Sequence, residues 1–286
     1  MKLIDGKETS KYLRSNLEKE IKKFKTRPKM IDIQIGYNMA SDIYIAGKAK
    51  ASEAIGIDFE CIRFEDGTKQ EKIISKIHEL NNDASVNGIF IQSPIPKSYD
   101  EIKIMNEVNP KKDIDGLTYI NAGRLLNNKK ALVSCTPNGI IELLKYYKIK
   151  IKGKNVCIIG RSNLVGKPLF NLFLNNDATV TLCHSHTKDL EKITKKADIL
   201  VVAIGVKHFV TAKHVKKNAV VIDVGINRED KKIYGDVNFD EVAPKTKFIT
   251  PVPGGVGPMT ITMLLKNVVD AYKDQNNILW KRKIKE

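Results

Sequence analysis

Four polar residues in the first half of the chain stand where they could act together in catalysis. Tyr44 and Lys48 are four residues apart, which places them on the same face of a helix. Gln92 ends an apolar run and Asp115 lies in a later polar segment, and ligands of open α/β sheets bind at strand ends of this kind. A lysine can carry protons where its neighbours lower its pKa, and a carboxylate can accept two adjacent donors. None of the four is diagnostic singly, since a lysine on an amphipathic helix is usually solvated.

A second candidate site is a tight turn between a strand and a helix, from Ile159 to Pro168. Gly160 lets the chain turn at the strand end, and free amide groups at the following helix terminus can bind a pyrophosphate. The spacing departs from the usual glycine fingerprint, because Ser162 takes the second glycine position and Gly166 comes one residue late. Many α/β proteins turn in this way without a nucleotide, so the prediction of dinucleotide binding depends on the strands around the turn.

The choice of nucleotide depends on the next strand. An NAD site usually carries a carboxylate about 20 residues past the glycine turn, for the ribose 2′-hydroxyl. Here strand 179–183 ends in His184, Ser185, His186 and Thr187, with no carboxylate. Arg161 can instead meet a 2′-phosphate and the Ser185 hydroxyl can donate to it, which favours NADP. The alternative is that Arg161 and His184 are solvent-facing loop residues.

Apolar runs that alternate with amphipathic stretches predict an α/β protein with parallel sheets. In the first half we expect strands 31–36, 59–64 and 88–92 and helices 41–56 and 72–81. In the second half we expect strands 155–160, 179–183, 198–205, 219–225 and 247–250 and helices 138–147 and 260–272. These elements predict two domains. An N-terminal three-layer α/β catalytic domain spans 1–136 and is completed by a helix in 262–286, and a Rossmann-like NADP-binding domain with a parallel sheet spans 137–261.

The order of these segments resembles the bifunctional methylenetetrahydrofolate dehydrogenase/cyclohydrolase family over essentially the whole chain. The matching stretches are Tyr44–Lys48, Gly88–Gln92, Lys112–Gly116, Gly160–Ser162, Val165–Gly166, Asp223–Asn227, Gly235–Val237 and Thr250–Thr260. The last stretch, TPVPGGVGPMT, is long and highly specific. One departure is Ser93, where the family usually has leucine, and it bears on substrate affinity rather than on the reaction.

The resemblance implies a role for each matching residue. Tyr44 would border the folate, Lys48 would be the catalytic lysine, and Gln92 would be its hydrogen-bonding partner. Asp115 would hold the pterin. The remaining implied contacts are Gly254, Gly255 and Pro258 for the folate, and Gly160, Arg161, Ser162, Ser185 and Ile226 for NADP.

The implied activity is oxidation of 5,10-methylenetetrahydrofolate to the methenyl compound with NADP, followed by hydrolysis to 10-formyltetrahydrofolate. No metal is expected, and the resemblance suggests a homodimer. The runner-up enzyme is a plain NADP dehydrogenase for a small hydroxy acid or a shikimate-like substrate. Such an enzyme would not be expected to carry the Tyr44, Lys48, Gln92 and Asp115 set together with the glycine–proline run.

Composition limits the other classes of function. The net charge of +16 makes nucleic acid a partner to consider. The lysines are, however, spread along the chain with only short runs such as 281–285, and no aromatic residues are interleaved with them. We therefore expect no nucleic acid, and an acidic partner such as a polyglutamylated folate could use the charge. No apolar run approaches the roughly 20 residues that span a bilayer, and no secretory signal opens the chain. Four widely spaced cysteines fit buried thiols in a reducing cytoplasm.

Overall fold

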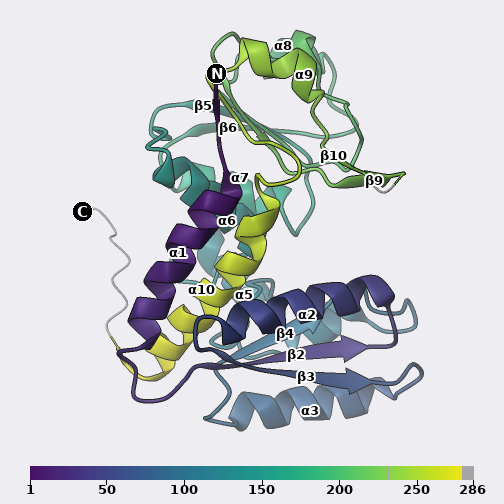
Figure 1. The fold of residues 1–286 in the computed structure, drawn as a ribbon. Coiled ribbons are helices and arrows are strands. Elements are labelled where there is room, and N and C mark those ends of the chain that lie inside the picture. Colours follow the sequence, from purple (N-terminus) through teal and green to yellow (C-terminus); the bar gives the residue numbers. More distant parts are fainter. Residues whose placement is uncertain (231, 279–286) are drawn as a thin grey trace. The chain divides into compact units, whose positions relative to one another are not determined.

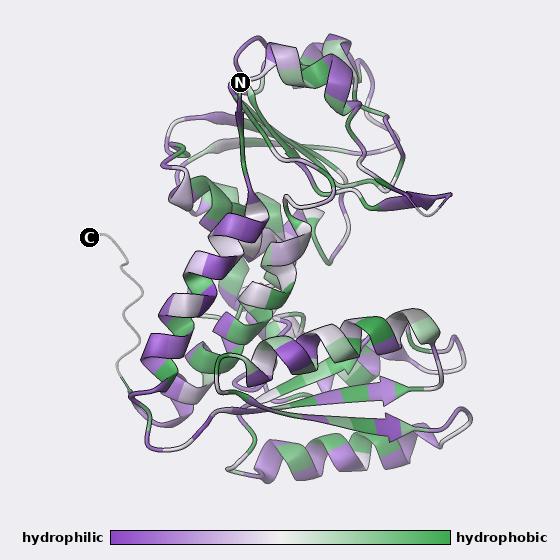
Figure 2. Cartoon of the chain, in the orientation of Figure 1, coloured by the Kyte–Doolittle hydropathy of each residue, from purple (hydrophilic) through white to green (hydrophobic). Residues whose placement is uncertain are grey.

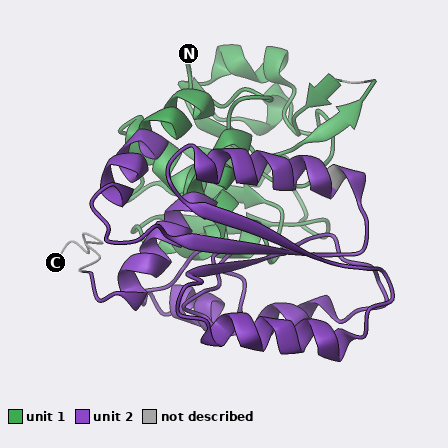
Figure 3. Ribbon diagram, turned by 60° about the horizontal axis from the view of Figure 1, so that its bottom comes forward, with its two compact units in different colours: residues 1–12, 134–263 green, residues 13–133, 264–286 purple. Residues whose placement is uncertain are grey.

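The computed structural model describes residues 1–230 and 232–278. The chain forms two compact units: unit 1 holds residues 1–12 and 134–263, and unit 2 holds residues 13–133 and the chain from Leu264 onward (Figure 3). Each unit carries a parallel sheet, so the predicted two-domain α/β class is confirmed. The part of the predicted final segment from 279 to 286 lies outside the described residues.

Unit 2 is built on a three-stranded parallel sheet in the order β3-β2-β4. Its strands are β2 (Lys29–Ile35), β3 (Asp58–Phe64) and β4 (Gly88–Gln92). Helix α2 (Met39–Glu53) lies on one face of the sheet and α3 (Gln70–Asn82) on the other, which makes three layers (Figure 1). All five elements lie within a few residues of the predicted ranges.

The central strand β2 separates two different environments. Ile31, Ile33 and Ile35 point to the α3 face, where they join a core with buried Ile73 and Ile77. Because side chains alternate along a strand, Met30, Asp32 and Gln34 point to the α2 face. That face is polar although it is buried: Asp32 is 0% exposed and Gln34 is 3% exposed. The polar face carries the candidate catalytic residues.

Several short helices complete unit 2. They include α4 (Glu101–Asn106) and α5 (Tyr119–Leu126). The division between the units falls inside α1 (Gly6–Ile21) and inside α10 (Gly257–Gln275). Asn267 of α10 donates from Nδ2 to the carbonyls of Ile114 and Val133, at 2.8 Å each, which holds the helix to the rest of unit 2.

Unit 1 contains a six-stranded sheet whose paired neighbours are all parallel, in the order β1-β11-β8-β7-β5-β6. The strands are β1 (Lys2–Leu3), β5 (Asn155–Ile159), β6 (Thr179–Cys183), β7 (Ile199–Val202), β8 (Val220–Asp223) and β11 (Phe248–Ile249). Its central strands are largely apolar (Figure 2), as expected for strands covered on both faces.

Helices and a hairpin surround this sheet. The helices are α6 (Cys135–Tyr146), α7 (Gly166–Leu174), α8 (Leu190–Thr194) and α9 (Phe239–Val242), with 3₁₀ turns at Ala212–His214 and Ala243–Lys245. Strands β9 (Asn227–Glu229) and β10 (Lys232–Tyr234) pair antiparallel.

Three strands of unit 1 are shorter than predicted by two residues or more. The predicted strand 198–205 ends at Val202 because the amides of Ile204, Gly205 and Val206 donate to the Asp236 carboxylate instead of to a neighbouring strand. The predicted strand 219–225 likewise ends at Asp223, whose own carboxylate accepts the Gly225 amide. The predicted strand 247–250 is reduced to two residues.

The first residues of the chain were predicted as part of the catalytic domain without an element of their own, whereas the structure groups residues 1–12 with unit 1. Strand β1 pairs with β11, and the Gly6 amide donates to the Gly254 carbonyl. Helix α1 begins after Asp5, whose carboxylate accepts the amides of Lys7 and Glu8. Along the chain, unit 2 gives way to unit 1 between residues 133 and 134, three residues before the predicted domain boundary between 136 and 137.

Candidate active site

Lys48 lies on α2 with its side chain 5% exposed, facing the polar side of the unit 2 sheet. Its ammonium donates to Gln92 Oε1 at 2.7 Å and forms an ion pair with Asp32. The ring of Phe90 lies under it, with Nζ 3.8 Å from the ring centroid. The structure therefore brings together Lys48 and Gln92, both predicted, and adds Asp32, for which the sequence predicts no role.

Strand register explains why these side chains converge. Asp32 pairs with Phe90, and Gln34 pairs with Gln92, along the parallel β2–β4 ladder. Residues paired in this way and two apart in sequence point to one face of the sheet. Gln92 Nε2 donates to the Ser93 carbonyl at 2.6 Å, which turns its Oε1 toward Lys48. The Ser93 hydroxyl, at the position where the sequence departs from the family pattern, donates to Glu101.

Burial and charge act in opposite directions on the lysine. Removal from water lowers the pKa of Lys48, while the charges of Asp32 and, more weakly, of Asp115 raise it. Burial also raises the pKa of Asp32, against the opposing charge of Lys48. Each group is thereby brought closer to its neutral form than it would be in water. A lysine whose pKa is lowered gives up a proton more readily than one in water, which suits proton transfer.

Asp115 lies in a loop that a neighbouring acid holds in place. The buried Asp113 carboxylate accepts the amides of Gly116 and Thr118, each at 2.9 Å, and Asn121 Nδ2 at 2.9 Å. Asp115 itself is partly exposed and close enough to contribute to the electrostatics of Lys48. The loop thus leaves the Asp115 carboxylate partly exposed and is supported by the Asp113 carboxylate.

The remaining predicted folate residues lie on other elements. Tyr44 is one turn before Lys48 on α2 and is 47% exposed, which leaves its ring available to a ligand. Gly254, Gly255 and Pro258 lie in unit 1, between β11 and the first turn of α10. A Cβ at Gly255 would lie 2.5 Å from the Pro251 carbonyl oxygen, so this turn requires glycine. Their joint role in one folate site stays a prediction.

The predicted nucleotide turn has the expected form in unit 1. Strand β5 ends at Ile159, and the next residue, Gly160, adopts a φ of 120°. A Cβ at Gly160 would lie 2.2 Å from the Ala203 carbonyl oxygen, so no other residue fits there. The expectation of free amides at the helix terminus is wrong at two positions. Ser162 Oγ accepts the amides of Val165 and Gly166, at 3.1 and 3.4 Å, so this hydroxyl caps the start of α7.

Arg161 and Ser185 occupy equivalent places on adjacent strands. Ile159 and Cys183, which end β5 and β6, are register partners. Arg161 comes two residues after Ile159, and Ser185 comes two residues after Cys183. Both side chains are exposed at the carboxyl edge of the sheet. A guanidinium and a hydroxyl there are the donors that a 2′-phosphate requires. Ile226, 51% exposed, follows β8 at the same edge. The close-packed glycine turn and these donors fit NADP.

Two buried acids support the loops at this edge. Asp223 accepts the amides of Gly225, Asp236 and Val237 at 2.9–3.0 Å, and Asp236 accepts those of Ile204, Gly205 and Val206. Burial, opposed by the amide hydrogen bonds, raises the pKa of Asp223 to about 6. Both acids lie in stretches that match the family pattern, and the sequence predicts no role for either of them.

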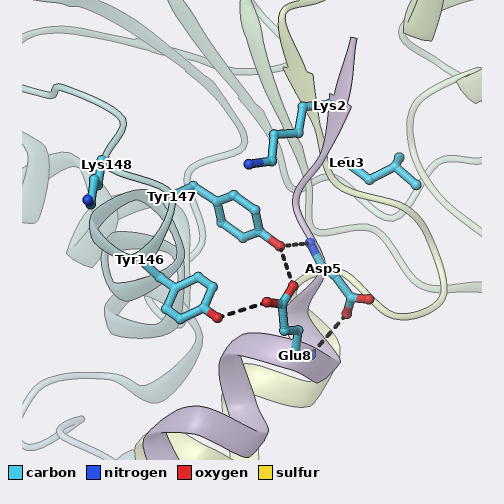
Figure 4. Close-up of a pocket in the computed structure, with 7 residues that line it drawn as sticks. All are labelled: Lys2, Leu3, Asp5, Glu8, Tyr146, Tyr147 and Lys148. Atoms are coloured by element: carbon cyan, nitrogen blue, oxygen red, sulfur yellow. Dashed lines mark hydrogen bonds between the residues drawn. The ribbon is translucent and has the colours of Figure 1, made fainter.

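A separate pocket of about 480 Å³ lies in unit 1, and none of the residues predicted for the site lines it. Figure 4 shows its lining, in which the hydroxyls of Tyr146 and Tyr147 donate to the two carboxylate oxygens of Glu8, at 2.9 and 3.3 Å. Tyr147 also accepts the Asp5 amide at 2.8 Å. These bonds connect the start of α1 to the end of α6.

Residues 1–230 and 232–278 lack the features of a metal site or a membrane span. They contain no group of three or more His, Cys, Asp or Glu side chains placed to hold a metal ion. No helix among them has the length and apolarity required to cross a bilayer. None of the four cysteines, all within these residues, is in a disulfide.

Comparison with known proteins decides between the enzyme classes. The family described as tetrahydrofolate dehydrogenase/cyclohydrolase matches twice: its catalytic domain covers residues 4–115 and its NAD(P)-binding domain covers residues 134–276. The chain belongs to this family. The first match contains Tyr44, Lys48, Gln92 and Asp115, and the second contains the glycine turn.

Relatives in this family match over nearly the whole chain. The bifunctional protein FolD of Exiguobacterium sibiricum is 47% identical over 274 residues, which is 95% of this chain and 99% of that protein. The bifunctional protein FolD of Bacillus cytotoxicus is 48% identical over 275 residues, 95% of this chain and 96% of the relative. The predicted family is confirmed.

Solved structures of enzymes in this family have the same fold as this chain. The bifunctional enzyme FolD of Campylobacter jejuni is 41% identical, with a TM-score of 0.94 over 96% of this chain and 99% of its own. The Trypanosoma brucei enzyme, complexed with NADP and an inhibitor, is 33% identical, with a TM-score of 0.90 over 96% of this chain and 98% of its own. Shikimate dehydrogenase of Thermus thermophilus, 15% identical with a TM-score of 0.53, shares only the fold.

Proposed function

We propose that this protein oxidises 5,10-methylenetetrahydrofolate to 5,10-methenyltetrahydrofolate with NADP and hydrolyses the product to 10-formyltetrahydrofolate. The observation that carries the proposal is the buried Lys48 amine, held by Gln92 and Asp32 in a chain of the tetrahydrofolate dehydrogenase/cyclohydrolase family. A lysine whose pKa is lowered by its removal from water suits proton transfer.

Lys48 acts in the hydrolytic step. Water adds to the methenyl carbon and loses a proton, for which the neutral amine is the acceptor. The bond from that carbon to one ring nitrogen then breaks, the nitrogen takes up a proton, and the hydroxyl loses one to leave the formyl group. Gln92 keeps the amine in place through these proton movements, since its own amide is fixed by the Ser93 carbonyl.

The folate is held by residues that change little in the reaction. The partly exposed Asp115 accepts two adjacent donors of the pterin edge. Tyr44 borders the rings, and Gly254, Gly255 and Pro258 shape the rest of the folate site. The family match and the fixed loop around Asp113 support these assignments.

The nucleotide is held at the carboxyl edge of the unit 1 sheet. Arg161 and Ser185 bind the 2′-phosphate, Gly160 and Ser162 form the turn beside the pyrophosphate, and Ile226 contacts the nucleotide at the end of β8. When bound, NADP accepts the hydride that the methylene carbon loses. The exposed donors at paired strand ends support NADP over NAD.

An absorbance assay tests the proposal. Purified protein is given methylenetetrahydrofolate with NADP or with NAD, and methenyl and NADPH formation are followed separately from the loss of added methenyl substrate. We expect both steps, with NADP much preferred. Turnover of shikimate or a hydroxy acid without turnover of folate would favour the plain dehydrogenase. Steep salt-dependent retention on heparin without folate or NADP binding would favour nucleic acid.

We further propose that the basic excess serves a polyglutamylated substrate. A folate tail of several glutamates is acidic, and the chain carries a net charge of +16. Polyglutamylated substrate should then have a lower KM than the monoglutamate, and added salt should narrow the gap, since screening acts over about 8–10 Å. Equal KM values at low salt would leave the charge unexplained by the substrate.

Two properties of the whole molecule are proposed from the family resemblance and the cysteines. The protein forms a homodimer, which light scattering of the purified chain would report as twice the 32.1 kDa mass. It works in the cytoplasm, where four cysteines without a disulfide stay reduced. A monomeric mass, or recovery of the native protein from an oxidising compartment, would contradict the respective proposal.

A further inference from the structure

Asp32 is the one strongly buried carboxylate on the α2 face of the unit 2 sheet, in the described part of the chain. It lies in the middle of the central strand β2 and is 0% exposed. Its neighbours in sequence, Ile31 and Ile33, are apolar and belong to the core on the other face. A carboxylate in such a place is costly unless a partner compensates for its removal from water.

The only ionic partner of Asp32 among the described residues is Lys48. The two form an ion pair, yet neither carboxylate oxygen receives a well-directed hydrogen bond from the described part of the chain. The next strands add no cation to the acid: Cys61 is its register partner on β3, and Phe90 is its partner on β4. Arg63, two residues beyond Cys61, pairs with Asp42 of α2.

A buried ion pair with few supporting hydrogen bonds is poorly compensated, because desolvation offsets much of the attraction between the charges. Burial pushes both members toward their neutral forms, and these differ from the ion pair by the movement of one proton from Nζ to the carboxylate. In that movement an N–H bond breaks, an O–H bond forms, and the amine regains its lone pair. No further reactant is required.

We propose that Asp32 is a positioning residue for the hydrolytic step: it holds the Lys48 amine beside Gln92 and sets, through their shared proton, the pH at which that amine can accept a proton from water. This inference rests on the proposed function, because it assigns a proton-accepting role to Lys48. It goes beyond that function by naming the group that controls the lysine. The other titratable groups that act on the amine are the Asp115 carboxylate and, more weakly, the Cys61 thiol.

Asp32→Asn tests the proposal, since it keeps the shape and removes the charge. Without the carboxylate, burial acts on Lys48 unopposed, and its titration should move to lower pH by at least about one unit. The limb of the pH–rate profile for methenyl hydrolysis that reports Lys48 should move equally. Glu60→Gln is the matched control, because Glu60 lies on the same sheet but pairs with Lys29 at the surface. In Glu60→Gln, the limb of the pH–rate profile that reports Lys48 should lie at the same pH as in the unmutated protein.

A second measurement separates this inference from the proposed function. The titration of Lys48 is followed directly, through the NMR shift of its labelled side chain, in the unmutated protein and in Asp32→Asn. A shifted titration without any hydrolysis would leave Asp32 in control of the lysine and overturn the proposed function. An unmoved titration in the folded variant would overturn the inference. If Asp32→Asn does not fold, Asp32→Val, which matches the apolar residues of the strand, carries the same test.

Discussion

Both units bury carboxylates beside a parallel sheet, and the partners of those carboxylates differ. In unit 1, Asp223 and Asp236 are surrounded by backbone amides that they hold in fixed loops. In unit 2, Asp32 meets a single ammonium and accepts no well-directed hydrogen bond from the described residues. The glycines of unit 1 make the first arrangement possible, since a Cβ at Gly235 would lie 1.8 Å from the Asp223 carboxylate.

The difference in partners distinguishes carboxylates that fix loops from a carboxylate that can share a proton. A carboxylate saturated by amides has little reason to move or to exchange its proton during a reaction, and it fixes the loops that bind a ligand. A carboxylate paired only with a lysine shares a proton that either member can hold. We infer that unit 1 is organised to hold the nucleotide rigidly and that the polar face of unit 2 is organised to move protons.

Lys48→Met should give the largest effect and tests the chemical side of this comparison. The substitution keeps most of the side-chain length and removes the amine. General acid–base assistance is typically worth about 10²–10⁴-fold, and the hydrolysis rate should fall by about that much. Dehydrogenation should fall less, because hydride transfer takes no proton from the enzyme. The exposed Lys50 on the same helix provides the control, and Lys50→Met should leave both rates intact. Undiminished hydrolysis by Lys48→Met would remove this lysine from the mechanism.

Asp115→Ala should impair both activities to a similar extent. Both substrates present the same pterin edge, so the loss acts on binding that the two steps share. A hydrogen bond to a charged group is typically worth about 1.5–3 kcal/mol, and kcat/KM for each step should fall accordingly. Asp66→Ala, in an exposed loop of the same unit, is the control. Unchanged folate affinity and rates in Asp115→Ala would show that the pterin is held elsewhere.

The supporting acids of unit 1 should be visible in the pH dependence of stability. The pKa of Asp223 is raised from 3.8 to about 6 in the folded chain, so its protonated form favours the native state. The stabilisation, about 3 kcal/mol, is fully present below pH 3.8 and is lost as the pH rises through 6. Asp223→Asn does not titrate. The free energy of unfolding by urea, taken as the difference between the unmutated protein and this variant, should fall by about 2 kcal/mol from pH 4.5 to 7.5. A constant difference would mean that Asp223 does not titrate in this range.

The elements that carry the site were predictable because their patterns are local. Alternating apolar residues located β2 to β4, and the Tyr44–Lys48 spacing placed both residues on α2. The role of Asp32 was not predictable in this way, since a single acid in an apolar strand has the same spacing whether it faces solvent or a lysine 16 residues later. The signal was nevertheless present: Asp32 is the one charged residue in the run from Met30 to Ile35, in which all the other residues except Gln34 are apolar.

The start of the chain shows a second kind of limit. Strand β1 has only two residues and owes its existence to pairing with β11, nearly 250 residues away, which no local pattern records. Helix α1 had a usable signal, since Asp5 followed by Glu8 is typical of a capped helix start. The overlong prediction for strand 198–205 has the same origin as the missed β1: the strand's end depends on Asp236, a distant residue that accepts the amides of residues 204–206.

Arg161→Ala should give the smallest effect, and it tests whether the exposed donors of unit 1 bind the 2′-phosphate. Because Arg161 is exposed at the strand edge, solvent weakens its contribution, and we expect a loss of about 1–2 kcal/mol for NADP. The KM for NADP should therefore rise about 5- to 30-fold, while the KM for NAD, which lacks the phosphate, should change little. Lys152→Ala removes a positive charge from the opposite end of β5 and controls for the general field of the unit. Ser185 remains in place in this variant, so some preference for NADP should survive. Equal losses for both nucleotides would mean that Arg161 supports the turn rather than the phosphate, and the preference would then have to come from Ser185 or from residues beyond this edge.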